Sequence, residues 1–244
     1  MQQVMAVILR ELIILKRKFW RYFFSFSIAP LLYFITFGWA GRQSLQSGGT
    51  DYSAFLLPGL IAMSAMTNSF ALSTEINVAR FYWKTFDEIR TAPVADWAYV
   101  VGEIASGMIR GFLAALVVIA MGLLFGVPLC VSPLLMISVL LTALVFSALA
   151  ISTASLAKSH ADQGMLNSFV ITPMAFLCGT FFPVETYPSW LQWLIELMPL
   201  TPASRLVRAA ATGWPLPPGP LGYLTALGAA FVAIAICIIR RTRD

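Results

Sequence analysis

The stretch Pro133–Leu156, PLLMISVLLTALVFSALAISTASL, decides the class of fold, because it runs for 24 residues without a charged side chain. A helix needs about 20 mostly apolar residues to cross the hydrocarbon core of a bilayer. The strands of a membrane barrel are much shorter and alternate between apolar and polar residues. Because lipid offers no water to unpaired backbone groups, this stretch is predicted to be a membrane-spanning helix.

The composition of the whole chain agrees with that prediction. Of 244 residues, 59% are hydrophobic and 11% are charged, whereas soluble domains are about 45–50% apolar and about 25% charged. This excludes a soluble globular protein, a disordered chain and a disulfide-stapled secreted domain. We expect an all-α integral membrane protein with a single transmembrane domain, 1–244. Its six predicted spans lie at about residues 23–40, 55–74, 99–125, 133–156, 165–182 and 221–239.

The segments between the spans differ in character. Segment 1–22 has a basic face and an apolar face, which predicts an amphipathic helix on the inner membrane surface or an ordinary basic flank of the first span. Segment 75–98 is the most charged connection. Segment 183–220 is the longest, with eight prolines and two amphipathic pieces at 190–198 and 202–211.

The basic residues predict the orientation, because cytoplasmic loops of membrane proteins collect Lys and Arg. With both termini inside, twelve basic residues are cytoplasmic and three are outside, and Arg110 lies within a span. A wrong number of spans would place some of these residues on the opposite side of the membrane and remove the bias. The cytoplasmic twelve are Arg10, Lys16, Arg17, Lys18, Arg21, Arg80, Lys84, Arg90, Lys158, Arg240, Arg241 and Arg243.

The chain lacks the chemistry of an ATPase or a metalloenzyme. It contains no GxxxxGK[ST] phosphate-binding loop, and none of its lysines follows a glycine. Its three cysteines are widely spaced, and its one histidine, His160, lies in a polar loop. The sequence therefore shows no zinc or other metal site and no catalytic set of residues. If the protein moves a substrate uphill, an ion gradient or a partner must supply the energy.

Ionisable residues deep in spans are few. Arg110 is the clear case, with Glu103 seven residues earlier on the same helical face and Glu75 at the same end of the second span. A buried guanidinium needs a partner or water. These three residues are therefore interpreted as a structural ion network near the inner face, with a substrate or proton role as the alternative.

Polar and aromatic residues mark the second and fifth spans. Such residues in lipid favour helix contacts or a wet path over contact with lipid. They are candidates for such contacts or such a path, and simple helix packing is the alternative. The candidates are Ser64, Asn68, Asn167, Thr172, Phe176, Phe181 and Phe182.

Two sets of sequence motifs stand out along the chain. The first set is FLLPGL at 55–60 and FDEIRTAPV at 86–94. The second is GTFFP at 179–183, YPSWL at 187–191 and PLT at 199–201. Together they resemble the motifs of the type-2 ABC exporter permeases, a family that includes nodulation-factor, polysaccharide and drug exporters. The resemblance covers essentially the whole chain, with Met198 standing where the family often has Asn.

The resemblance implies an exporter subunit in the bacterial inner membrane that binds no ATP itself. A separate ABC ATPase subunit would hold ATP and Mg, and a second permease copy would complete a homodimeric path for an amphipathic or lipid-linked substrate. Segment 75–98 would be the cytoplasmic coupling loop, and 183–220 an outer re-entrant helical hairpin. The second and fifth spans, with their polar and aromatic candidates, would form the substrate path or dimer seam. The coupling helix would comprise Phe86, Asp87, Glu88, Ile89, Arg90, Thr91, Ala92 and Pro93.

Two other classes remain open at this point. A membrane-embedded enzyme acting on lipid-linked substrates would need a polar catalytic constellation near one face, and the sequence offers only Arg110 and Glu103. An ion-coupled transporter would be expected to carry more ionisable residues deep in its spans. Nothing in the sequence points to nucleic acid as a partner, and membrane lipids are the expected surroundings.

Overall fold

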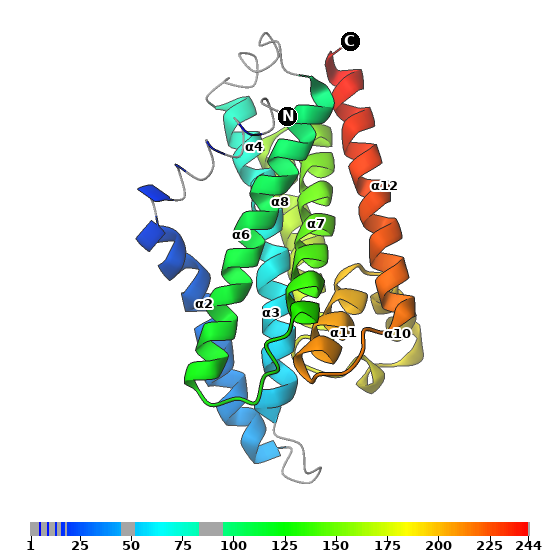
Figure 1. The fold of residues 1–244 in the computed structure, drawn as a ribbon. Coiled ribbons are helices and arrows are strands. Elements are labelled where there is room, and N and C mark those ends of the chain that lie inside the picture. The colour runs from blue at the N-terminus through cyan, green and yellow to red at the C-terminus, as the bar shows by residue number, and fades with distance from the viewer. Residues whose placement is uncertain are drawn as a thin grey trace.

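A computed structural model describes residues 19–44, 52–82 and 95–243, together with Met5, Leu9, Ile13, Lys16 and Arg17. All regular structure within these residues is helical (Figure 1). The long helices are α2 (Phe19–Ser44), α3 (Tyr52–Phe70), α4 (Leu72–Phe81), α6 (Asp96–Leu124), α7 (Pro133–Leu156) and α12 (Pro218–Arg243). The short ones are α8 (His160–Leu166), η1 (Asn167–Ile171), α9 (Thr172–Leu177), η2 (Val184–Thr186), α10 (Ser189–Glu196) and α11 (Leu200–Ala211).

Helix α3 forms the centre of the bundle. It packs against α2, α6, α7 and α11, and 78% of the most apolar part of α3–α4 is buried, against 22% for α12. The outer helix α12 lies mainly against α7. Its exposed apolar residues suit contact with lipid, because an apolar side chain in a membrane need not be buried inside the protein.

Four helices in the described part of the chain are long and apolar enough to cross a membrane. They are Tyr52–Phe81, Asp96–Leu124, Pro133–Leu156 and Pro218–Arg240, and they correspond to the second, third, fourth and sixth predicted spans, the third ending one residue earlier than predicted. Helix α2 contains the first predicted span. The all-helical membrane class is thus confirmed, and the count of six spans stays a prediction.

The second predicted span ends at residue 74, but its helix does not. After a break at Ala71, α4 continues to Phe81. This helix, α8 and the end of α12 lie toward one end of the bundle, and α10 and α11 lie at the other (Figure 1). Helix α4 therefore projects the second span toward the segment that the sequence marks as the coupling loop.

The fifth predicted span, 165–182, is not one regular helix. Helical backbone runs from His160 to Leu177, but residues Asn167–Ile171 form a π-helix. Pro173 follows directly and has no N–H to give to an α-helical ladder, while the Thr172 hydroxyl donates to the Asn167 carbonyl over 3.0 Å. The helix ends at Cys178, and Gly179 adopts a φ of +80° that favours glycine.

The two amphipathic pieces of 183–220 are both helices, α10 and α11. Trp190, Trp193 and Leu197 on or next to α10 are 60% exposed or more, whereas α11 buries one whole face. Aromatic side chains are common at the membrane interface. That this segment re-enters the membrane stays a prediction, as does the amphipathic helix predicted for 1–22, most of which lies outside the described residues.

Candidate functional site

The two motif segments meet at one end of the bundle, at a contact we call the outer junction. Gly59 of α3 lies against the backbone of Thr180, so closely that an added Cβ would stand 2.5 Å from the Thr180 carbonyl oxygen and 2.8 Å from its Cα. The Tyr52 hydroxyl donates to the Phe181 carbonyl over 2.8 Å. Only glycine permits this approach of backbone to backbone, which is a physical reason for the Pro58-Gly59 pair.

Arg208 of α11 ties the outer junction together. Its guanidinium donates to the carbonyl oxygens of Gly179, over 2.7 Å, and Phe55, over 3.4 Å, and stacks on the Phe55 ring at 4.0 Å. Burial lowers the pKa of Arg208 to about 10, so the group stays charged at neutral pH. Sequence reasoning counted Arg208 only as an outside charge. The signal in the sequence that could have pointed to Arg208 was its position in the strongly amphipathic segment 202–211.

The predicted path residues of the second span face the inside of the protein. Ser64 is buried, and the half-buried Asn68 amide donates to the Ser64 carbonyl over 2.9 Å. The Asn68 amide N–H is thus paired within its own helix, and Ser64 is enclosed by protein. For these two residues the geometry favours helix packing over a wet path.

The predicted residues of the fifth segment are divided between two environments. Phe181 is buried against α2, with ring centroids 4.6 Å from Phe37 and 5.4 Å from Tyr33. Asn167, in the π-helix, is half-buried, and the remaining members of this set are exposed on the outside of this protomer, where a second chain or lipid can reach them. Those members are Thr172, Phe176 and Phe182.

The Arg110 side chain forms an ion pair between two helices. Its guanidinium on α6 contacts the Glu75 carboxylate on α4 at 2.5 Å and lies 5.7 Å from the centre of the Tyr22 ring on α2. The side chain of Arg110 is 6% exposed and that of Glu75 is 47% exposed. Glu103 is buried two turns earlier on α6. The pair therefore ties α4 to α6.

A second polar contact, which we call the amide clasp, joins α4 to α8. The Gln163 amide donates to the Ser73 hydroxyl over 2.9 Å and accepts from the Asn77 amide over 3.0 Å. All three side chains are fully buried. Buried amides are costly unless they are paired, so the clasp fixes the angle between the two helices. Sequence reasoning did not find it, because a Gln in a polar loop and an Asn in a charged segment give no signal.

Arg80, one turn after the clasp, joins α4 to the end of α7. Its guanidinium donates to the Ser155 carbonyl over 3.1 Å and to those of Ala154 and Ala157 over 3.4 Å. These are among the last carbonyls of α7, which have no partner within their helix and attract a cation. The predicted coupling helix, Phe86 to Pro93, begins a few residues further on and lies outside the described residues.

Helices of membrane length, tied at both ends by buried polar contacts, define a multi-pass membrane protein. The family model for "ABC-2 type transporter" matches residues 2–211, and the chain belongs to this family. The chain is 31% identical over 176 residues to "Inner membrane transport permease YadH" of Escherichia coli strain K12, covering 71% of this chain and 68% of that protein.

A second group of relatives carries the name "Nodulation protein J". The protein of Neorhizobium galegae is 32% identical over 191 residues, which are 77% of this chain and 73% of that one. The protein of Rhizobium meliloti strain 1021 is 32% identical over 190 residues, covering 77% and 72%. The family resemblance read from the motifs is thus confirmed, and the chain is a membrane-embedded subunit of a transporter.

Gly59→Ala is expected to destabilise the protein by about 1–3 kcal/mol, the usual cost of overpacking. The added methyl group would meet Thr180 backbone atoms, which cannot rotate away as a side chain can. The measurement is the thermal unfolding of the purified protein in detergent. Gly222→Ala is the matched control, because nothing lies within 4 Å of its added Cβ, and its stability should be unchanged or slightly higher. Equal stability of both variants would contradict the close approach at Gly59.

Proposed function

We propose that this chain is the permease subunit of an ATP-driven exporter that moves an amphipathic or lipid-linked substrate out across the inner membrane. Membership of the ABC-2 transporter family supports the transport class. The chain itself carries no phosphate-binding loop, so a separate ABC ATPase subunit, with its ATP and Mg, supplies the energy. The exported substrate belongs to the amphipathic class because the exposed faces of the fifth segment and α10 are rich in aromatic residues.

The anchoring of α4 is the observation that carries the coupling role. This helix leads directly into the loop that would seat in the ATPase, and buried contacts tie it to three neighbours. Glu75 pairs with Arg110 of α6, Arg80 caps α7, and Asn77 and Ser73 hold Gln163 of α8. A displacement of the loop would therefore reach the third, fourth and fifth spans together.

A second copy of the chain completes the transporter in this proposal. Six spans are few for enclosing a large substrate, and the fifth segment leaves apolar and polar residues exposed on one protomer. Phe176 is 38% exposed and Phe182 is 49% exposed. The expected assembly is two permease copies with two ATPase subunits, which the mass of the purified complex would test.

The proposed orientation places both termini and 75–98 in the cytoplasm, because of the twelve-to-three bias of basic residues. In a background without Cys130, Cys178 and Cys237, a Ser47→Cys variant should react with a membrane-impermeant thiol reagent added to intact cells. Lys84→Cys should react only after permeabilisation. The reverse pattern would contradict this orientation.

Deletion of residues 86–91, or the double reversal Asp87→Lys/Glu88→Lys, is expected to release the ATPase subunit. The two acids are expected at the start of the coupling helix, where the helix dipole favours negative charge. Replacing them with lysines would set positive charges against an ATPase surface that complements negative ones. Such contacts between like charges cost several kcal/mol at an interface. Copurification of the ATPase subunit should fall about tenfold or more, with normal membrane insertion.

The matched control reverses two acids on the opposite side, Asp51→Lys/Glu185→Lys. Glu185 is exposed, and its carboxylate lies 3.8 Å from the Arg205 guanidinium. This control should keep full copurification and export. Undiminished copurification and export in the 86–91 deletion would instead remove the coupling role from this loop.

A further inference from the structure

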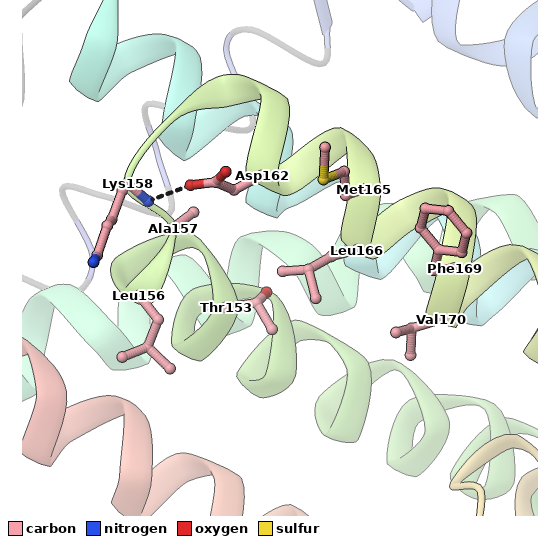
Figure 2. A pocket seen from close by; sticks show the side chains of 9 residues that line it. All are labelled: Thr153, Leu156, Ala157, Lys158, Asp162, Met165, Leu166, Phe169 and Val170. Atoms are coloured by element: carbon pink, nitrogen blue, oxygen red, sulfur yellow. Dashed lines mark hydrogen bonds between the residues drawn. The ribbon is translucent and has the colours of Figure 1, made fainter.

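A groove opens on the side of the bundle between the end of α7 and the helical run of α8 and η1 (Figure 2). Its volume is about 530 Å³. We call it the inner groove. It is lined by Thr153, Leu156, Ala157, Lys158, Asp162, Met165, Leu166, Phe169 and Val170.

The walls of the inner groove are hydrocarbon. Leu156, Met165 and Phe169 are 61–78% exposed in the protomer, so apolar material from outside can enter. Thr153 is the one hydroxyl among the lining residues, and it donates to the Leu149 and Ala150 carbonyls of its own helix, both at 3.0 Å. It therefore offers no donor to a ligand in the groove.

One end of the groove carries a cation. The Lys158 ammonium has no hydrogen bond or ion pair with the described residues, and its side chain points away from Asp162 (Figure 2). The Asp162 carboxylate is used locally, because it accepts the backbone N–H groups of Lys158 and Ser159, each over 3.0 Å. Asp162 and Ser159 form the capping box of α8. Within the part of the chain that the structure describes, the Lys158 ammonium at the mouth thus has no ionic partner.

The dimensions match one lipid chain. The helical residues 160–170 rise about 15 Å at about 1.5 Å per residue, which is half of the roughly 30 Å hydrocarbon core and hence one leaflet. A helix of a second copy would bring its own basic residues to this end of the groove, because the twelve-to-three bias puts them at the cytoplasmic face, whereas a phospholipid headgroup brings a negative charge. The groove therefore suits an acyl chain better than a helix of a second copy.

We propose that the inner groove binds an anionic glycerophospholipid of the inner leaflet, with one acyl chain between α7 and η1 and the headgroup phosphate at the Lys158 ammonium. The choice of the inner leaflet rests on the proposed orientation, which places Lys158 at the cytoplasmic face. The lipid would pack against the π-helix, whose irregular backbone marks the fifth segment. Its binding needs neither ATP nor the ATPase subunit.

The test uses the full-length protein in nanodiscs of mixed phosphatidylglycerol and phosphatidylcholine. A trace of either lipid carries a photoreactive acyl chain, and labelled peptides are mapped by mass spectrometry. Lys158→Gln removes the cation, and Thr153→Phe fills the groove. Arg240→Gln is the matched control, since it removes an exposed cation near the same membrane face on α12.

We expect the anionic probe to label residues 153–170 about fivefold more than the zwitterionic one, as one basic residue near an anionic lipid contributes on the order of 1 kcal/mol. Lys158→Gln should reduce that ratio to about one, and Arg240→Gln should leave it unchanged. Thr153→Phe should lower labelling by both probes. Thermal unfolding of each variant identifies any that fails to fold, and Lys158→Gln, at an exposed position, keeps the test decisive.

Equal labelling of the unmodified protein by both probes, or a ratio that survives Lys158→Gln, would overturn the proposal. So would a disulfide-linked permease dimer formed by Phe169→Cys in the cysteine-free background, because this face would then belong to a second copy. None of these readouts involves export. A failure of the exporter proposal would therefore leave the labelling pattern intact, and the two can be told apart.

Discussion

Glu75→Gln is expected to destabilise the protein by about 3 kcal/mol. The substitution deprives the buried Arg110 guanidinium of the carboxylate that it contacts at 2.5 Å. Breaking a buried ion pair costs about 3–5 kcal/mol, and we expect the lower end because the Glu75 side chain is 47% exposed and partly screened by water. The measurement is the unfolding of the purified protein in detergent micelles.

Glu75→Gln, Arg110→Met and the double variant together form a double-mutant cycle, which measures the interaction energy between the two side chains. Arg110→Met should cost less than Glu75→Gln, because the carboxylate that remains is half in water, whereas the guanidinium is almost fully buried. Arg110→Met/Glu75→Gln should recover much of the stability, since both charges are gone. A coupling energy below about 0.5 kcal/mol, the error of additivity between independent sites, would contradict the pair.

Export by the same variants separates a structural role from a substrate role. If the pair only joins α4 to α6, export should return with stability in the double variant. A double variant that is stable but inactive would mean that Arg110 contacts an anionic substrate group. Arg110→Met/Glu103→Gln is the matched comparison on α6 alone, and it tests whether the coupling extends to Glu103, which is buried on the same helix.

Hydropathy was enough to predict the class of fold, because the bilayer imposes one length and one kind of backbone on any span. Pro133–Leu156 has the same bounds in the sequence analysis and as α7. The motif pair around Gly59 and Thr180 gave the family, and the outer junction shows a physical reason for two distant segments to share a pattern.

The sequence was a weaker guide where helices are held together by single contacts. Helical spacing grouped Glu103 with Arg110, and the position of Glu75 at the same end of the second span added it to the predicted ion network. The contact with Glu75 crosses from α6 to α4 and depends on packing. The irregular turn at Asn167 likewise depends on the backbone around Pro173, which hydropathy does not register.

The coupling residues and the path residues remain predictions. Phe86 to Pro93 lies outside the described residues, and the contacts of Thr172 or Phe176 with a second copy require that copy. For Ser64 the single protomer is more informative, because burial of the side chain favours packing within the chain. Exposure in one protomer therefore separates the candidates that a second copy could contact from those that are buried within the chain. Residue type alone did not make this distinction.

Gln163→Leu is expected to be as damaging as the loss of Glu75, at about 2–4 kcal/mol. It removes the acceptor of the Asn77 amide and the donor to the Ser73 hydroxyl, both in a fully buried place. A buried polar group left unsatisfied costs about 1–3 kcal/mol, and each lost hydrogen bond adds about 1 kcal/mol. Thermal unfolding measures the effect. Thr142→Val is the matched control, since this buried hydroxyl bonds only the Ser138 carbonyl of its own helix.

The triple variant Ser73→Ala/Asn77→Leu/Gln163→Leu separates stability from coupling. Replacing all the partners by apolar groups of similar size is close to neutral for stability, so this variant should unfold nearly as the original protein does. If the amide clasp carries motion from α4 to the fifth segment, as the proposed function requires, export should still fall about tenfold while the ATPase subunit copurifies normally. A triple variant that exports at the original rate would reduce the clasp to packing. One that unfolds as early as Gln163→Leu would show that the three side chains do not act as a unit.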